Sequence, residues 1–186
     1  MTKDITTIKE LKKYLEADFK ANDRKRWSCG YRYIKWVRIT RYLFLKKDFF
    51  RGKLICGLAR CIRNHYGNKF GYVVPYRKNM GKGYSFSHNT GVIFEPESAG
   101  DYLIFRNFVV VGYSLNGEGN PIIGNYVQFG AGSKVIGNIR IGNNVVIGAN
   151  AVVTEDVPDN SVVAGIPAKV IRKTKDRWGT RMEDNV

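Results

Sequence analysis

The sequence is poor in the residues that bind metals, form disulfides or cross membranes. Its 186 residues include three cysteines and two histidines. Cys29, Cys56 and Cys61 are odd in number and lack metal-ligand spacing, so we expect reduced, inert thiols and no metal site. No uncharged apolar run approaches the roughly 18 residues of a membrane-spanning helix. The first 22 residues carry Lys and Glu where a signal peptide would be apolar, so we expect a cytoplasmic protein.

Acidic residues are also scarce. There are 16 Asp and Glu against 31 Lys and Arg, a formal net charge of +15. The imbalance is concentrated in residues 24–78, where the only acidic residue is Asp48. Such a charge favours anionic partners, which are nucleic acid, a membrane surface or a phosphorylated cofactor.

Residues 1–74 contain no proline and are expected to form a basic, aromatic-rich helical region. Three segments are candidates for helices: 5–21, 31–47 and 51–67. In the first, four apolar residues share one face: Ile8, Leu11, Leu15 and Phe19. The third is expected to end at Gly67, as at a helix C-cap. A strand is an alternative over 31–45, which is rich in Tyr, Ile, Val and Trp.

Basic residues recur at every third position of the second candidate helix: Arg32, Lys35, Arg38 and Arg41. These residues share one broad face, with aromatic residues between them. A helix of this kind can lie at an anionic membrane surface, which predicts peripheral contact with the inner membrane. In the alternative, the aromatic residues form the core of the helical region and the charges are merely solvated.

From about residue 75 the sequence repeats every six residues. Six apolar residues follow one another at this spacing: Ile123, Phe129, Val135, Ile141, Ile147 and Val153. The same phase includes Val111, Phe105 and Ala99, and then Met80, Phe86 and Val92 after a slip of one residue between Val92 and Ala99. Residues 112–122, which are rich in Gly and Asn, are expected to project as a loop.

A period of six does not fit a flat sheet, in which side chains alternate every two residues. It fits short strands separated by sharp corners, three to a coil of eighteen residues, each coil stacked on the next. The apolar residues then stack inward, for example Ile123 over Ile141. A β-sandwich would not keep this phase, so we expect a parallel β-helix over 75–166 and a tail over 167–186.

The repeat resembles that of the hexapeptide-repeat acyltransferases, whose fold is a left-handed parallel β-helix. The segment "DNSVVAGIPAKVIRK" (159–173) matches the terminal motif of that family. "SHNTGVIFEPES" (87–98), followed by the loop, resembles the serine acetyltransferase branch. The short, basic helical N-terminus is most similar to the offshoot of that branch that O-acetylates capsular and other surface polysaccharides.

The resemblance implies that His88 is the catalytic base, since neutral imidazole can take a proton from an attacking hydroxyl near pH 7. His65, outside the repeat, is expected at the surface. Two positions depart from the serine acetyltransferase pattern, which has Asp where this chain has Ser87 and a second His where it has Asn120. Asn120 and Glu95 are candidates for binding the acceptor. Glu95, Glu97 and Asp101 are candidates for orienting His88.

The resemblance also implies that acetyl-CoA lies along the coils, in a groove between two subunits of a homotrimer. The candidate residues for binding it are Gly112, Gly130, Ala131, Gly148, Ala149, Lys169 and Lys173. Small residues would let the pantetheine arm approach the backbone, the lysines would meet the phosphates, and a backbone N–H near Gly112 would stabilise an oxyanion.

The leading hypothesis is an acetyl-CoA-dependent O-acetyltransferase that acts on a sugar hydroxyl of a surface polysaccharide or its precursor. The first alternative is serine O-acetyltransferase, against which stand Asn120 and a helical region about half the usual length. The second is a non-catalytic trimeric scaffold or a nucleic-acid binder. No RNA-binding signature is present, so we expect no nucleic-acid partner.

Overall fold

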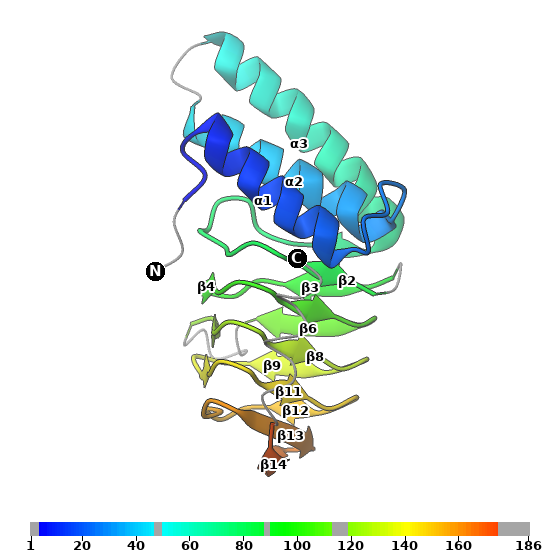
Figure 1. Ribbon diagram of the computed structural model, residues 1–186, viewed down its shortest axis with the longest axis vertical. Coiled ribbons are helices and arrows are strands. Elements are labelled where there is room, and N and C mark those ends of the chain that lie inside the picture. Colours follow the sequence, from blue (N-terminus) through cyan, green and yellow to red (C-terminus); the bar gives the residue numbers. More distant parts are fainter. Residues whose placement is uncertain (1–3, 47–49, 88–89, 113–118, 175–186) are drawn as a thin grey trace.

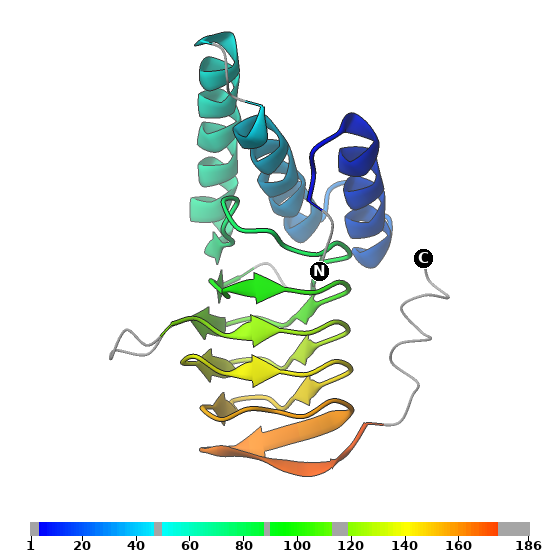
Figure 2. The same cartoon turned by 90° about the vertical axis from the view of Figure 1, so that its left-hand side faces the viewer.

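The helices lie at one end of a column of stacked strands, as Figures 1 and 2 show in the computed structural model. The structure describes residues 4–46, 50–87, 90–112 and 119–174. Within these ranges it contains three α-helices and fourteen β-strands. The helices cover the first coil of the column, and later coils follow in chain order away from them.

Helix α1 (Ile8–Ala21) begins at a capping box. The Thr7 side chain accepts a hydrogen bond from the backbone N–H of Glu10, and the Glu10 carboxylate accepts one from the N–H of Thr7. This reciprocal cap satisfies the first donors of the helix. The helix therefore starts at Ile8, three residues later than the apolar pattern predicts.

Helix α2 (Cys29–Leu45) follows an N-cap at Ser28, so the helical interpretation holds over 31–45. Helix α3 (Phe50–Phe70) does not end at Gly67 as predicted. A Cβ at Gly67 would lie 2.9 Å from the carbonyl oxygen of Tyr72, so glycine is needed there for close packing. The chain leaves the helix at Gly71, whose φ of +68° is in the left-handed region.

The strands form three sheets, which are called A, B and C below. Sheet A contains β1 (Tyr72–Val73), β3 (Val92–Phe94), β6 (Val109–Gly112), β9 (Lys134–Ile136) and β12 (Val152–Val153). Sheet B contains β4 (Ser98–Ala99), β7 (Ile122–Ile123) and β10 (Arg140–Ile141). Sheet C contains β2 (Ser85–Phe86), β5 (Ile104–Phe105), β8 (Gln128–Phe129), β11 (Val146–Ile147), β13 (Ser161–Gly165) and β14 (Ala168–Lys173).

The strand register confirms the predicted stacking. Ile123 pairs with Ile141, Phe129 with Ile147 and Val135 with Val153, each pair in parallel strands. These side chains are buried along the axis of the column. The rings of Phe105 and Phe129 stack with centroids 5.1 Å apart. The chain therefore forms a parallel β-helix whose core is the six-residue ladder.

The phase slips at a different place from the one predicted. Val111 pairs with Phe94, not with Val92, and Phe105 pairs with Phe86. Phe86 and Phe94 are thus eight residues apart, whereas Phe105 and Val111 are six apart. Relative to a period of six, the sequence therefore has two extra residues between Phe86 and Phe94 and one fewer between Phe94 and Ala99. Val92 was assigned to the ladder because it is apolar at the right spacing, and its side chain is indeed buried, but it pairs with Val109.

Three corners connect the sheets in every coil. The CA corner joins sheet C to sheet A and contains 87–91, 106–108, 130–133 and 148–151. The AB corner contains 74–79, 95–97, the described residues 119–121, 137–139 and 154–156. The BC corner contains 81–84, 100–103, 124–127, 142–145 and 158–160. Most of the predicted loop over 112–122 is outside the described residues, and Gly112 itself ends β6.

The C-terminal segment is not a free tail at its start. Strand β14 pairs antiparallel with β13, from Gly165 opposite Ala168 to Ser161 opposite Lys173. The chain reverses at Ile166–Pro167, and β14 pairs along the free edge of β13 as the outermost strand of sheet C. Residues 175–186 are outside the described part of the chain.

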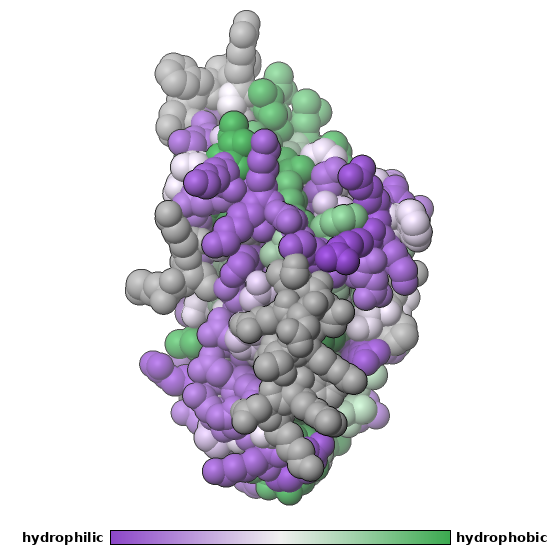
Figure 3. All heavy atoms as spheres, in the orientation of Figure 1, coloured by the Kyte–Doolittle hydropathy of each residue, from purple (hydrophilic) through white to green (hydrophobic). Residues whose placement is uncertain are grey.

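The basic residues of α2 do not form one solvated face. Arg38 is buried and Arg41 is bound to Asp4, whereas Arg32 packs on the Tyr66 ring. Tyr33, which lies between them, is buried as the alternative expects of the aromatic residues, but the burial of Arg38 contradicts its expectation that the charges are solvated. Exposed apolar side chains are instead found on α3, at Leu54, Ile55 and Leu58, and Figure 3 shows apolar residues gathered at the helical end. Among the described residues, no helix is both long and apolar enough to span a bilayer.

Candidate active site

The candidate site residues fall into two groups at two different corners of the column. His88, Gly130, Ala131, Gly148 and Ala149 belong to the CA corner by their place in the chain. The other group, at the AB corner, contains Glu95, Gly112 and Asn120. Sheet A lies between the two corners.

Small residues at the CA corner form a narrow column of closely stacked backbone. The N–H of Gly130 donates to the carbonyl of Ile147 at 2.8 Å, and the N–H of Asn150 donates to the carbonyl of Ala131 at 2.8 Å. A Cβ at Gly130 would lie 2.6 Å from the backbone nitrogen of Ala149. Glycine at 130 is therefore required by the stacking of the coils. Ala149 is exposed, which leaves a surface that an extended chain could follow.

His88 itself is outside the described residues, as is Asn89. The chain enters this turn at Ser87, whose N–H donates to the carbonyl of Phe105 at 3.0 Å. It leaves at Gly91, which has φ +64° and donates to the carbonyl of Phe70 at 3.1 Å. The described residues on both sides, Ser87 and Gly91, are thus anchored to neighbouring backbone. A catalytic role of His88 stays a prediction.

The AB group is held by the coil backbone. The N–H of Glu95 donates to the carbonyl of Val111, and the N–H of Glu97 donates to the carbonyl of Pro121, each at 2.8 Å. The Asn120 side-chain oxygen is buried and has no hydrogen-bond partner among the described residues. Such an atom is costly unless a ligand or another part of the protein satisfies it. Asn120 and Glu95 both belong to the AB corner.

One chain does not bring the two groups together. Gly91 and Glu95 lie at opposite ends of β3, so a strand rise of about 3.3 Å per residue separates them by roughly 13 Å. Glu95 is therefore not at the same corner as the turn that contains His88.

The other two acidic candidates for orienting His88 are engaged elsewhere. Glu97 pairs with Lys78 at 2.9 Å, and Asp101 pairs with Lys82 at 2.6 Å. Asp101 belongs to the BC corner. No cluster of three or more His, Cys, Asp or Glu side chains suited to a metal ion is present in the described residues.

The two lysines predicted to meet CoA phosphates lie at different ends of β14. Lys169 pairs with Ala164 of β13, beside the CA corner of the last coil. Its ammonium is 2.8 Å from the Glu155 carboxylate, and both side chains are largely exposed. Lys169 can therefore exchange Glu155 for another anion at little cost in free energy. Lys173 lies opposite Ser161, near the BC corner. Only Lys169 is close to the column of small residues.

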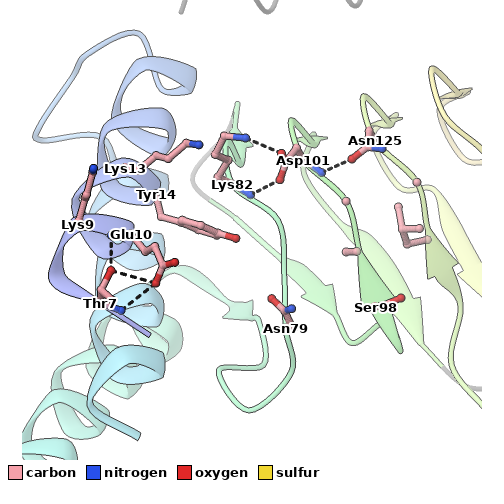
Figure 4. A pocket seen from close by; sticks show the side chains of 14 residues that line it. Thr7, Lys9, Glu10, Lys13, Tyr14, Asn79, Lys82, Ser98, Asp101 and Asn125 are labelled. Carbon is pink, nitrogen blue, oxygen red and sulfur yellow. Dashed lines mark hydrogen bonds and ion pairs between the residues drawn. The ribbon is translucent and has the colours of Figure 1, made fainter. Parts of the chain in front are cut away.

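A large groove lies between α1 and sheet B and has a volume of about 1140 Å³ (Figure 4). Lys9, Lys13 and Tyr14 line its helical side. Its other side contains Lys82 and Asp101, which hydrogen-bond each other. Because sheet B is opposite the CA corner, this groove is not adjacent to the turn that contains His88.

A smaller cavity borders the AB corner, and sequence reasoning missed it. It has a volume of about 250 Å³ and lies between α3 and the first two coils. Glu95 lines it together with Arg63, Tyr76 and Arg77. The only signal in the sequence is the basic composition of residues 24–78, which does not show that α3 lies over the AB corner.

Known proteins resemble this chain in sequence and in fold. A family model described as bacterial transferase hexapeptide (six repeats) matches residues 120–155. A serine acetyltransferase of Helicobacter pylori strain J99 is 33% identical over 143 residues, which cover 75% of this chain and 78% of the relative. Among solved structures, the Neisseria gonorrhoeae serine acetyltransferase in complex with serine has a TM-score of 0.72 and 31% identity, covering 87% of this chain and 69% of that one. A serine acetyltransferase in complex with CoA has a TM-score of 0.72 and 25% identity, covering 88% and 71%.

These relatives change two expectations from the sequence. The similarity was expected to be greatest to polysaccharide O-acetyltransferases, whereas the relatives found are serine acetyltransferases. The short helical region was taken as evidence against that family, yet the match covers similar shares of this chain and of the Helicobacter pylori protein, so the two are of similar length. The level of identity over most of both chains leads to one assignment: this protein belongs to the serine acetyltransferase family of hexapeptide-repeat transferases.

Proposed function

We propose that the protein transfers the acetyl group of acetyl-CoA to the hydroxyl of L-serine. The observation that carries the proposal is the 33% identity to a serine acetyltransferase over most of both chains. Solved structures of similar fold in complex with CoA and with serine support the same donor and acceptor.

In the proposed reaction His88 is the general base. The serine hydroxyl gives its proton to the imidazole as its oxygen attacks the thioester carbonyl. A C–O bond forms, the C–S bond of the tetrahedral intermediate breaks, and the proton leaves with the CoA thiol. O-acetylserine and CoA are the products. The CA column of Gly130, Ala131, Gly148 and Ala149 would lie along the pantetheine arm, with Lys169 near the phosphates.

The proposal includes a homotrimer of left-handed β-helices. The CA corner of one subunit would face the AB corner of the next, so that His88 meets the Asn120 and Glu95 of its neighbour. The separation of the two groups within one chain supports this arrangement. It also gives the partnerless oxygen of Asn120 a place beside the acceptor.

A second candidate keeps the donor and the base but changes the acceptor to a sugar hydroxyl. Ser87 and Asn120 favour it, because serine acetyltransferases have Asp and His at these positions. Asn120 can hydrogen-bond a hydroxyl but cannot act as a base.

A panel of acceptors distinguishes the two candidates. The purified protein is given acetyl-CoA and either L-serine or a set of free and nucleotide-linked sugars, and release of the CoA thiol is followed. We expect thiol release with serine to be clearly faster than the slow hydrolysis of acetyl-CoA that is measured without an acceptor. Turnover with a sugar and none with serine would reject serine as the acceptor.

A further inference from the structure

The cavity at the AB corner contains an unusual arrangement of charges around one aromatic ring. The Arg63 guanidinium carbon lies 4.5 Å from the centroid of the Tyr76 ring, and that of Arg77 lies 5.7 Å from it. Arg77 Nε also donates to the Tyr76 hydroxyl at 3.3 Å, and the charge of Arg60 also acts on Tyr76. Three cations therefore surround Tyr76.

No carboxylate forms an ion pair with these three arginines in the part of the chain that the structure describes. Like charges held this close repel one another, and an opposite charge nearby would offset that repulsion. Burial alone would raise the pKa of Tyr76, but the neighbouring guanidinium groups of Arg77 and Arg60 outweigh it and lower that pKa. The ring is thus in a strongly positive environment, which an anionic ligand would relieve.

A single carboxylate lines the same cavity. Glu95 is exposed, and its side chain forms no ion pair within the described ranges. The hydrogen bond from its backbone N–H to the carbonyl of Val111 fixes the position of its backbone. The cavity is therefore lined by two arginines and one carboxylate, within about 250 Å³.

We propose that this cavity recognises the acceptor as an α-amino acid zwitterion. The α-carboxylate binds the guanidinium groups of Arg63 and Arg77, which match it as planar donors, and it replaces Asn64 Oδ1 as the acceptor of Arg63 Nε and Nη2. The α-ammonium binds Glu95. This assignment rests on the proposed function.

Direct binding measurements without donor test the assignment. L-serine and L-alanine are titrated into the intact protein by calorimetry, together with L-serinamide and N-acetyl-L-serine. L-alanine has the same charges as serine but no hydroxyl, so it should bind with similar affinity. Each of the two blocked compounds lacks one charge and should bind roughly tenfold or more weakly, since one charge-assisted hydrogen bond is worth that much.

Variants identify the residues. R63Q/R77Q should weaken both amino acids roughly tenfold or more, and E95Q should weaken them while leaving N-acetyl-L-serine unchanged. R26Q/R140Q removes the same charge from exposed arginines outside the cavity and should change binding by less than about twofold. Thermal melts establish that each variant is folded.

The outcomes separate this proposal from the proposed function. If L-alanine binds and R63Q/R77Q abolishes that binding, the cavity is an amino-acid site, even if serine is not acetylated. If serine is acetylated but R63Q/R77Q and E95Q change neither its KM nor the affinity for L-alanine, the cavity assignment is wrong and the proposed function stands. Equal weakening by R26Q/R140Q would also reject it, since the attraction would then be nonspecific.

Discussion

Arg38 of α2 and Asp18 of α1 form a buried ion pair, with Nε 2.8 Å from Oδ2. Arg38 also donates to the carbonyls of Met80 and Gly81, at 3.2 and 2.6 Å. Asp18 accepts from the backbone N–H of Tyr84 at 2.9 Å. The pair therefore joins two helices to the first coil of the β-helix.

This pair belongs to a cap on an otherwise open strand edge. The first coil has no coil before it, so its backbone groups need other partners. Asn22 supplies two of them, by donating to the carbonyl of Tyr84 at 2.9 Å and accepting from the N–H of Phe86 at 3.3 Å. Helical side chains thus take the place of a missing strand, which explains why a basic residue of α2 is buried.

Replacing Arg38 with alanine should destabilise the protein by about 3–5 kcal/mol, because it leaves Asp18 buried without its counter-charge. Denaturant unfolding followed by circular dichroism measures this loss. Lys35→Ala on the same helix removes a charge with no ion pair in the described residues and should cost less than about 0.5 kcal/mol. Similar losses in both variants would mean that the pair is not important for stability.

Gly130 and Gly112 should differ in their tolerance of alanine. A Cβ at Gly130 would meet the backbone of the next coil at 2.6 Å, whereas a Cβ at Gly112 has nothing within 4 Å. Gly130→Ala should therefore lower the free energy of unfolding by about 1–3 kcal/mol, even without CoA. Gly112→Ala should be nearly neutral, within about 0.5 kcal/mol. A stable Gly130→Ala variant that has lost only its affinity for CoA would show that the glycine serves the donor and not the stacking.

The inward ladder could be predicted because each of its residues occupies the same position in a coil. Ile123 and Ile141 pair as the spacing of eighteen requires, since burial leaves an apolar signal at every repeat. The ends of the helices were less predictable. Gly67 resembles a helix C-cap in sequence, but only the tertiary contact with Tyr72 shows why it lies inside α3.

The candidate site was less predictable than the ladder. The order of residues is known from the sequence, but the corner that each residue occupies depends on the strand register. In the second coil Phe94, and not Val92, pairs with Val111 and so fixes that register. The cavity around Tyr76 depends on where α3 packs, which no local pattern encodes. The burial of Arg38 was missed for the same reason, because its partners are far away in the sequence.

Replacing His88 with alanine should abolish acetyl transfer while the protein remains folded. Loss of a general base typically lowers the rate by about 10²–10⁴-fold. The fold should persist because the buried ladder holds the β-helix together, which a thermal melt can check. His65→Ala is the control and should retain near-normal turnover. Near-normal turnover of His88→Ala on the true acceptor would make His88 a structural residue.

The shared site predicts a trimer in solution. Light scattering should give three times the chain mass of 21.2 kDa at micromolar concentration. A monomeric mass would count heavily against a site formed between subunits, because His88 and Asn120 belong to corners on either side of sheet A within one chain.

Mixing two inactive variants tests the same idea more directly. His88→Ala lacks the base and Asn120→Ala lacks the acceptor contact, so neither homotrimer should be fully active. If each site takes His88 from one subunit and Asn120 from the next, unfolding and refolding the two together should restore about a quarter of the sites, since a quarter of the neighbouring pairs then contain both native residues. Simple mixing without refolding is the control and should restore none. Activity that stays at the level of the separate variants after refolding would place both residues in a site within one chain, or would show that Asn120 takes no part.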